Sequence, residues 1–244
     1  MKKLILFILF LLPVALSGQE TIVARREGGD TEILKHPGFT ACYNYATLQP
    51  DWVSWEITPE TVVYDGNVSR CDEFLPDPLA SRPTATTFSY SRTGYDRGHM
   101  APAADFRYDQ TAQDETFFLS NICLQEHKLN EKTWFELEKR CRFWCKNFYK
   151  TPLLLAAGPL FDEDPARVGR DSLPVPSGFW KVVCKFDRGN WEAVGFVFPN
   201  EALDEDFRNY AVSVDEVERL TGLDFYPSLA GKLDESGFDL GRWK

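Results

Sequence analysis

The residues best suited to chemistry lie in one short stretch near the middle of the chain. Asp96-Arg97-Gly98-His99 places an imidazole just behind an arginine and a glycine, in a chain of 244 residues with only 3 histidines. Hydrolysis of a phosphodiester needs a base for water, a cation for the developing charge and a proton for the leaving oxygen. This stretch predicts the base and part of the positive charge.

His99 has the side chain expected of the base. An imidazole whose second ring nitrogen is held by a backbone carbonyl is neutral, and its unperturbed pKa of about 6.5 suits proton transfer near neutrality. Gly98 would let the backbone turn and keep the ring accessible. Arg97 can donate two parallel hydrogen bonds to phosphate oxygens, a geometry that a lysine does not offer.

Asn130 and Glu138 predict a metal site on a helix further along the chain. The amide oxygen of Asn130 suits a hard cation such as Mg²⁺, which keeps most of its waters, and one of these waters can protonate the leaving oxygen. Glu138 lies two turns along the expected helix and can accept a hydrogen bond from water on the metal. Asn121 could position those waters or the loop of the base.

Each candidate also has a structural explanation. The alternatives are a surface pair of Asp96 with Arg97, a helix N-cap at Asn130 and an ion pair of Glu138 with Arg142. Asp105 is a further carboxylate that could bind metal, but a loop cap or salt bridge is the favoured explanation for it. A lone histidine is more often structural than catalytic. The residues therefore carry a functional prediction only as a set.

Alternating apolar and polar residues predict the strands that must position this set. The expected strands are 43–45, 52–57, 116–120, 153–157, 179–186 and 191–198. Gln49-Pro50-Asp51 supplies turn residues between the first two, and Asp187-Arg188-Gly189-Asn190 predicts a hairpin between the last two.

Two helices are expected. Apolar residues recur at intervals of three and four from about Asn130, and Thr151-Pro152 ends the pattern. Ser213 and Glu216 form a capping box for a second helix over 214–220, which Gly222 ends. With no internal repeat, these elements predict an α+β fold: a mixed, mainly antiparallel β-sheet core with flanking helices.

The chain is acidic, with a formal charge of −10 that becomes −12 once Lys2 and Lys3 are removed. Tight static binding to nucleic acid is disfavoured, because it depends on clustered lysine and arginine. Catalysis remains compatible with this charge if a local basic strip holds the phosphate. That strip would be Lys128, Lys132, Lys139, Arg140, Arg142, Lys146 and Lys150. Charge pairs on a solvated helix face are the alternative explanation for most of these side chains.

Residues 1–18 have the pattern of a signal peptide. Two lysines precede an apolar run from Leu4 to Leu16, with small residues near Ser17. The sequence thus predicts export to the periplasm or the medium, no membrane attachment of the mature form, an N-terminal extension over 19–37 and one domain over 38–244. An uncleaved membrane anchor is the alternative, although the apolar run is short for one.

Six cysteines suggest disulfide bonds in an exported protein. All lie beyond residue 18, and an even count is typical of disulfide frameworks, although the pairing stays open. They are Cys42, Cys71, Cys123, Cys141, Cys145 and Cys184. A zinc site formed by Cys141, Cys145 and His127 is one alternative, and free buried thiols are another.

The central stretch and its surroundings resemble the DNA/RNA non-specific endonucleases of the ββα-metal (His-Me finger) type. Residues 95–105 match the family signature almost in full, and the likeness continues through 118–122, Gln125, 129–130 and 134–138. It spans roughly residues 38 to 228. The resemblance implies a ββα-metal motif and a nuclease that cuts DNA and RNA with little sequence preference, leaving 5′-phosphate ends.

The resemblance also implies the metal chemistry. His99 is implied as the general base, and Asn130 as the sole direct protein ligand of Mg²⁺, for which Mn²⁺ could substitute. Glu138 is implied as the carboxylate that contacts the metal's waters. Asn121 matches a position that supports the site.

The implied substrate contacts are arginines. Arg97 is implied as a phosphate clamp. Arg70 stands where the family has an arginine that stabilises the transition state. Arg92 is the alternative for that function, because it lies closer to His99 in sequence, and it is a further candidate for binding substrate.

Two departures from the family pattern lie at the rim of the site. Ile122-Cys123-Leu124 replaces a small or proline-containing stretch, and Asn130-Glu131-Lys132 replaces Asn-Gln-Gly. They affect substrate preference rather than mechanism. The leading hypothesis is an exported Mg²⁺-dependent endonuclease; a catalytically silent nucleic-acid-binding protein and a zinc protein are the alternatives, and a homodimer is compatible with the sequence.

Overall fold

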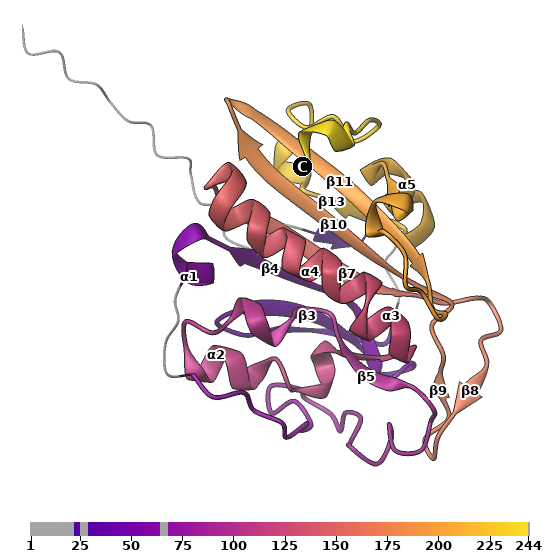
Figure 1. Cartoon of the computed structure of the whole chain (residues 1–244). Coiled ribbons are helices and arrows are strands. Elements are labelled where there is room, and N and C mark those ends of the chain that lie inside the picture. Colours follow the sequence, from indigo (N-terminus) through magenta and orange to yellow (C-terminus); the bar gives the residue numbers. More distant parts are fainter. Residues whose placement is uncertain (1–21, 25–28, 64–67, 244) are drawn as a thin grey trace, which may run out of the picture.

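A seven-stranded antiparallel sheet forms the centre of the molecule (Figure 1). The computed structural model describes residues 22–24, 29–63 and 68–243. The strand order is β12-β11-β10-β7-β4-β3-β2, so β7 joins strands from the two halves of the chain. The architecture is the mixed, mainly antiparallel one that the sequence predicts.

The strands of this sheet are β2 (Thr31–Lys35), β3 (Phe39–Asn44), β4 (Gln49–Ile57), β7 (Leu153–Leu160), β10 (Gly178–Asp187), β11 (Asn190–Pro199) and β12 (Ala211–Val212). Smaller pairs are β1 (Ile22–Ala24) with β13 (Leu223–Phe225), β5 (Asp96–His99) with β6 (Ile122–Gln125), and β8 (Arg167–Val168) with β9 (Leu173–Pro174). The α-helices are α1 (Pro59–Val63), α2 (Gln110–Glu115), α3 (His127–Glu131), α4 (Thr133–Phe143) and α5 (Val214–Thr221). A π-helical segment, η4 (Trp144–Tyr149), continues α4. The 3₁₀ helices are η2 (Ala103–Asp105), η3 (Leu119–Asn121), η5 (Phe207–Tyr210), η6 (Pro227–Leu229) and η7 (Leu240–Arg242).

Alternation along the strands divides the apolar side chains between the two faces of the sheet. In β7, Leu153 and Leu155 belong to one core cluster, and Leu154 and Ala156 belong to the other. Helix α4 and η4 pack on the first face, and α5 and β13 pack on the second (Figure 1). Because both faces are buried, the central strands are almost continuously apolar.

The helical segment on the first face begins earlier than its apolar spacing predicts. Helix α3 starts at His127, and the Glu126 side chain caps it by accepting a backbone hydrogen bond at 2.9 Å. Lys132 then breaks the helix with φ −118° and ψ −94°, and α4 follows. Asn130 therefore lies in the last turn of α3 and is not an N-cap, and Glu138 lies on a second helix.

The predicted helix near residue 214 is confirmed. Ser213 Oγ accepts a hydrogen bond from the backbone N–H of Glu216 at 3.2 Å and so caps α5. Gly222 ends the helix in the left-handed conformation, with φ 71°, where other side chains are strained. Val214 and Val217 attach α5 to the second face of the sheet.

Strands β5 and β6 and helix α3 form a ββα unit. β5 carries the DRGH sequence and pairs with β6, so that His99 lies opposite Ile122. Gly98 serves close packing in this strand and not a turn as expected: its φ lies outside the left-handed region, and a Cβ atom there would lie 2.2 Å from Gln125 Oε1. A larger residue would therefore push the two strands apart.

Two expected local structures are wrong. Residues 116–120 form no strand, because η3 occupies their end and the strand follows as β6. Residues 49–51 lie inside β4, and the turn before it occupies 45–48. The ladder shifts register between Cys42 and Tyr43, opposite Pro50, and such an irregularity accommodates a proline within a strand.

The sheet corrects the expected domain boundary. Strand β2 lies within the stretch expected as an extension, 19–37, yet it pairs with β3 from Thr31 opposite Asn44 to Lys35 opposite Thr40. The folded domain therefore begins before residue 38. Among the described residues, no helix is long and apolar enough to cross a membrane.

All six cysteines are free thiols in the described structure, so the predicted disulfides are wrong. Cys42 on β3 and Cys184 on β10 face the same cluster, but two strands lie between theirs, about 14 Å at the usual strand spacing. A disulfide requires Cα atoms within about 7 Å.

The zinc alternative fails as well. Cys141 and Cys145 are buried in the core, and burial raises the pKa of each thiol to about 12, which disfavours the thiolate that zinc requires. His127 is exposed and contacts carboxylates instead. These three residues form no metal-binding group in the part of the chain that the structure describes.

Candidate active site

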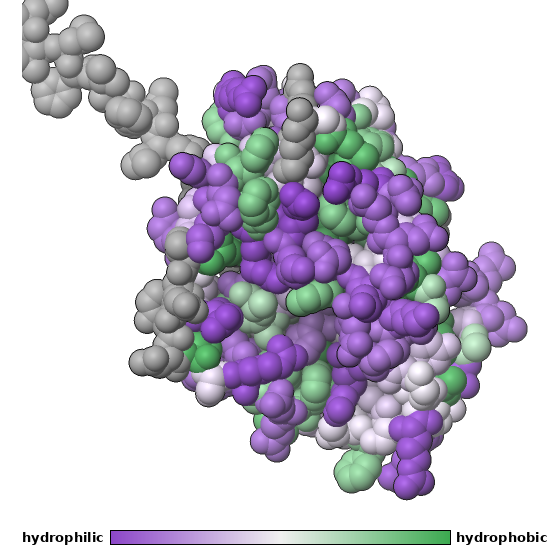
Figure 2. Space-filling view, in the orientation of Figure 1, coloured by the Kyte–Doolittle hydropathy of each residue, from purple (hydrophilic) through white to green (hydrophobic). Residues whose placement is uncertain are grey.

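A cleft of about 470 Å³ opens between β5, the end of α3, the start of α4 and the segment around residue 70. Five of the predicted site residues line it together: Arg70, Arg97, His99, Asn130 and Glu138. They come from separate segments, so only the fold brings them together. The face that carries α3 and α4 is mostly hydrophilic, with scattered hydrophobic patches (Figure 2).

His99 is held between two phenylalanine rings. Phe117 meets it edge-on with the ring centroids 4.8 Å apart, and the Phe74 ring lies at 5.6 Å. Burial, with further contributions from Arg70 and Arg97, lowers the pKa of His99 to about 3. The imidazole is therefore neutral at pH 7 and able to accept a proton.

The second ring nitrogen of His99 lacks the expected backbone partner. Nε2 is buried and makes no hydrogen bond to any described residue. The ring is thus fixed by packing against Phe74 and Phe117 rather than by a carbonyl group. This arrangement leaves Nδ1 as the nitrogen that can act on water in the cleft.

Asn130 is oriented by Asp96. Its Nδ2 donates to Asp96 Oδ2 at 2.9 Å, which leaves the amide oxygen Oδ1 available to another group. The same carboxylate oxygen lies 3.0 Å from His127 Nδ1, and this hydrogen bond is the main cause of a raised pKa of His127. Asp96 thus contacts the candidate metal ligand, and the surface pair with Arg97, which was the alternative explanation of Asp96, is not formed.

Arg70 and Arg97 reach the cleft over aromatic rings. The guanidinium carbon of Arg97 lies 4.3 Å from the centre of the Phe74 ring, and that of Arg70 lies 4.9 Å from the centre of the Phe117 ring. Both arginines are exposed. Cation–π packing can direct a guanidinium group while its N–H donors stay available for phosphate.

Arg92 lies beside the cleft rather than in it. It lines a neighbouring cavity of about 380 Å³, which shares Arg97 and Asn130 with the cleft but does not include His99. Of the two arginines considered for the transition state, Arg70 therefore shares a cavity with the base, and Arg92 does not.

Asn121 lies outside the cleft and is fully buried. Its Oδ1 accepts from the backbone N–H of Ala101 at 2.9 Å, and its Nδ2 donates to the carbonyl oxygens of Ala101 and Thr116 at 2.9 and 2.8 Å. The backbone N–H of Met100 donates to the Asn121 carbonyl at 3.0 Å. Of its two expected functions, the contacts favour fixing the loop that follows His99.

Glu138 lies at the floor of the cleft and is only 9% exposed. Burial raises its pKa to about 7, and nearby Lys181 and Arg142 oppose that rise. Arg142 does not pair with Glu138 as the alternative proposed, because it donates to Asp105 Oδ1 at 2.7 Å. The salt bridge considered for Asp105 is confirmed.

Most of the expected basic strip does not face the cleft. Of its seven side chains, Lys132 lines the cavity. Lys139 pairs with Glu136 at 2.7 Å, one turn away on an exposed surface. The solvated helix face is the better description of these residues, and the arginines supply most of the positive charge at the site.

The donor set fits a hard divalent cation. Asn130 Oδ1 is a neutral oxygen with its amide nitrogen already engaged, and the Glu138 carboxylate lines the same cleft. One protein oxygen with a carboxylate nearby is the pattern expected for an ion that keeps most of its waters. The residues present therefore fit the metal that the sequence implied.

Sequence reasoning missed the parts that hold the reactive groups. Asp96 was treated only as a surface residue, although its place next to Arg97 in the motif was a signal. Phe74 and Phe117 form the wall behind the base, but no local pattern separates them from ordinary core residues. Their function follows from the fold alone.

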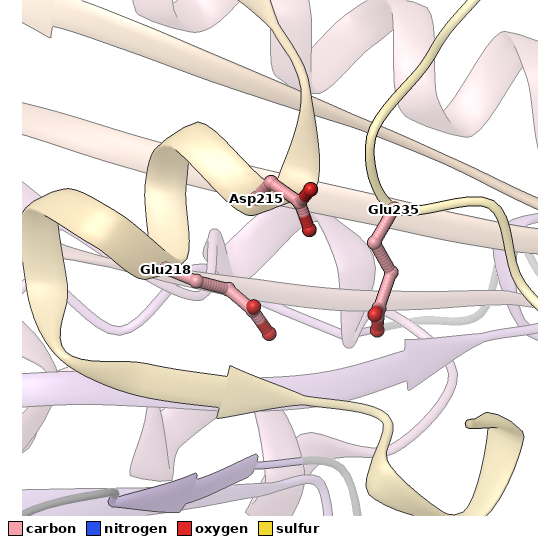
Figure 3. Close-up of side chains that lie close together, drawn as sticks. All are labelled: Asp215, Glu218 and Glu235. Atoms are coloured by element: carbon pink, nitrogen blue, oxygen red, sulfur yellow. The ribbon is translucent and has the colours of Figure 1, made fainter. Parts of the chain in front are cut away.

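A cluster of carboxylates lies away from the cleft. Asp215 and Glu218 from α5 point toward Glu235 from the C-terminal segment, with ligand atoms within 4.8 Å of one another (Figure 3). Glu218 Oε1 accepts from the backbone N–H of Phe225 at 2.8 Å, and the backbone N–H of Asp215 donates to the Glu235 carbonyl at 3.0 Å. These contacts give the cluster a structural function in joining α5 to its neighbours.

The chain matches known proteins over most of its length. The model of the DNA/RNA non-specific endonuclease family matches residues 17–232. The chain belongs to this family. Mitochondrial endonuclease G of Bos taurus is 32% identical over 217 residues, which cover 84% of this chain and 72% of that protein. A nuclease of Nostoc sp. is 31% identical over 219 residues, covering 85% of this chain and 77% of that protein.

A solved structure agrees with the family. An EndoG in complex with EndoGI superposes on this chain with a TM-score of 0.75 and 28% identity, covering 82% of this chain and 88% of that one. The predicted family, the fold class and a nuclease activity for this DNA/RNA non-specific endonuclease are thereby confirmed.

The prediction of export is contradicted by the same comparisons. The relatives in Bos taurus, Homo sapiens and Saccharomyces cerevisiae are named as mitochondrial nucleases. Residues 1–18, on which the prediction depended, lie outside the described residues. A basic, apolar N-terminus is a general targeting pattern, so it did not determine the compartment.

Proposed function

We propose that this protein is a metal-dependent endonuclease that hydrolyses phosphodiester bonds of DNA and RNA with little sequence preference. The observation that carries the proposal is the meeting of a neutral His99 and an oriented Asn130 in one cleft. Together they offer a proton acceptor and a cation ligand to the same phosphate. Membership of a nuclease family supports this activity.

His99 is the general base of the proposed reaction. Its Nδ1 takes a proton from a water molecule while the water oxygen forms a bond to phosphorus and the bond from phosphorus to the 3′ oxygen breaks. A water molecule held by the cation would supply a proton to the 3′ oxygen, so that the products carry a 5′-phosphate and a 3′-hydroxyl group. The low pKa of His99 keeps the ring neutral for this step, and Asn121 keeps the loop behind it in place.

Asn130 is the proposed protein ligand of Mg²⁺, with Mn²⁺ as a substitute. A bound divalent cation stabilises the negative charge that develops on the phosphate and the leaving oxygen. Asp96 keeps the Asn130 oxygen turned toward the cleft by accepting from its amide nitrogen. With a cation bound, Glu138 would accept hydrogen bonds from its hydration water.

Arginines hold the substrate in this proposal. Arg97 clamps the non-bridging oxygens, and Arg70 stabilises the charge of the transition state, because it shares the cleft with His99. Arg92 contacts the nucleic acid beyond the cleavage point, in the adjoining cavity. The acidic remainder of the chain favours release of the cleaved product.

Cleavage of matched DNA and RNA strands tests the proposal. Labelled DNA and RNA of one sequence are incubated with purified protein and either Mg²⁺ or EDTA, with His99→Ala as the inactive control. We expect cuts at many positions in both strands, with Mg²⁺ only, and 5′-phosphate ends. Retention of either strand in a gel shift without any cutting would favour a silent binding protein instead.

A further inference from the structure

A lysine is buried beneath the proposed active site. Lys181 on β10 is fully buried under α4, and its Nζ makes no hydrogen bond to any residue in the described part of the chain. The ammonium group lies 4.1 Å from the centre of the Trp134 ring and 5.2 Å from that of Trp55. An ammonium group in such surroundings is unfavourable unless an opposite charge lies near it.

That opposite charge is Glu138. Lys181 and Glu138 interact electrostatically, and each favours the ionised form of the other. The other charges near them, Arg142 on α4 and Asp105 on η2, are paired with each other at 2.7 Å. Lys181 is therefore the cation left to balance the carboxylate at the floor of the cleft.

We propose that Lys181 is a positioning residue that keeps the Glu138 carboxylate ionised and facing the cleft. The inference rests on the proposed function, in which that carboxylate accepts hydrogen bonds from hydration water of the cation. Lys181 acts from behind α4 and touches neither substrate nor metal. Because its Nζ forms no hydrogen bond, Lys181 does not itself occupy an acceptor site of the Glu138 carboxylate.

The same strand offers a matched control. Lys185, four residues further along β10, is equally buried, but its Nζ lies 3.1 Å from Glu192 and 3.5 Å from Asp187. It also lies 3.4 Å from the centre of the Tyr149 ring. Lys185 does not line the cleft, so replacing it tests the general effect of losing a buried lysine.

The central experiment is a double-mutant cycle on the full chain. Lys181→Met should lower kcat by about 10- to 100-fold with little change in KM for nucleic acid, as expected for loss of a partner that orients a metal-site group. In a Glu138→Gln background the same change should have less than about twofold further effect. Lys185→Met should leave kcat of the folded protein unchanged.

The pH profile distinguishes positioning from simple packing. Without Lys181, the acidic limb of kcat should move to higher pH, and raising the pH should restore part of the lost rate. The charged groups that face Glu138 from the other elements, Arg142 and Asp105, are unchanged in this variant. A profile that keeps its midpoint while its height falls would overturn the proposal.

Binding of Mn²⁺, measured by calorimetry without nucleic acid, gives a readout other than activity. If Glu138 becomes neutral when Lys181 is lost, Lys181→Met should bind Mn²⁺ more weakly than the wild type at pH 7 to 8, where the wild-type carboxylate is at least half ionised. If Glu138 stays ionised, loss of a positive charge should strengthen binding, and that result would contradict the proposal.

Two further measurements separate a failure of this inference from a failure of the variant to fold and from a failure of the proposed function. If Lys181→Met does not fold, Lys181→Gln serves in its place, and equal kcat of folded wild type and Lys181→Gln would overturn the inference. If the wild type itself cuts neither DNA nor RNA, the proposed function fails, whereas the Mn²⁺ titration still tests the pairing of Lys181 with Glu138.

Discussion

Two buried lysines on one face of β10 have opposite surroundings. Lys185 is balanced by carboxylates at 3.1 and 3.5 Å, whereas Lys181 has no direct ionic or hydrogen-bond partner among the described residues and lies under the cleft. The first arrangement is the one expected when a buried charge supports the fold. The arrangement of Lys181 is less favourable for the stability of the fold. Its position under the cleft, beside Glu138, gives it a functional explanation.

The contrast extends to the atoms around the cleft. His99 Nε2, Trp134 Nε1 and Lys181 Nζ are all buried without a hydrogen-bond partner in the described structure. Each such atom costs about 1–3 kcal/mol when its partner is missing. Buried atoms without a hydrogen-bond partner also occur elsewhere in the described structure, on Ser54 and Trp180 for example, so such atoms are not confined to the proposed site.

The largest predicted effect is loss of the base or of the metal ligand. His99→Ala and Asn130→Ala should each lower kcat/KM by about a thousandfold or more, while the unfolding temperature stays close to that of the wild type. Rates on labelled DNA and unfolding curves check this. His36→Ala is the control, because His36 lies outside the cleft and hydrogen-bonds Asp77 at 2.9 Å; it should lose stability and keep its activity.

Arg70 and Arg92 should differ in the parameter that they change. Arg70→Ala should lower kcat by about a hundredfold, because it removes charge that stabilises the transition state. Arg92→Ala should mainly raise KM, since its cavity adjoins the cleft without reaching His99. Steady-state kinetics on one DNA substrate separates them, and a larger kcat loss for Arg92→Ala would assign the transition state to that residue.

Replacement of the two lysines should change the stability of the protein by different amounts. Lys185→Met removes the buried cation beside Asp187 and Glu192 and should cost about 3 kcal/mol, as removal of one partner from a buried pair usually does. Lys181→Met removes a buried cation that makes no hydrogen bond among the described residues, and Glu138 can take up a proton once that cation is gone, so the free energy of unfolding should change little. Urea unfolding of both variants gives the comparison, and equal losses would refute the distinction.

The smallest predicted effect is a pH dependence set by Glu138. Its pKa is raised to about 7, so the carboxylate ionises and kcat should rise as the pH passes through 7. The pKa of His99 at about 3 adds no limb in that range. The pKa of Glu138 is higher in the folded protein than in the unfolded protein, so the protonated carboxyl group favours the folded state. The contribution of Glu138 to the free energy of unfolding is therefore complete below about pH 4.5 and is lost by pH 7.

The variant Glu138→Gln provides the control for this prediction. It should lose the acidic limb of the rate profile and also the decline in unfolding free energy between pH 4.5 and 7. If the rate of Glu138→Gln still rises near pH 7, the titration of another group must cause that rise.

The strands were largely predictable because buried sheets impose alternation over long runs. The hairpin at 187–190 and the α5 cap at Ser213 follow from local residue chemistry. The break at Lys132 does not, because the apolar spacing continues across it and only the backbone angles reveal two helices. The irregularity opposite Pro50 likewise depends on pairing with a distant strand.

The site was predictable where a motif holds its residues close together in sequence. Arg97 and His99 were identified in this way, and Asn130 was identified from the helical pattern further along the chain; the structure brings all three into one cleft. Lys181 was not identified, because the residues on either side of it predict a buried strand and give no sign of a functional site. Its relation to Glu138 depends on α4 packing over β10, which neither segment encodes alone.

The most direct test of the account is incubation of a covalently closed circular plasmid with purified protein. Such a circle has no ends, so only internal cleavage can open it. With Mg²⁺ we expect nicked, then linear, then fragmented DNA, and with EDTA or with His99→Ala we expect intact circles. Circles that stay closed with Mg²⁺ and wild-type protein would contradict the proposed endonuclease activity.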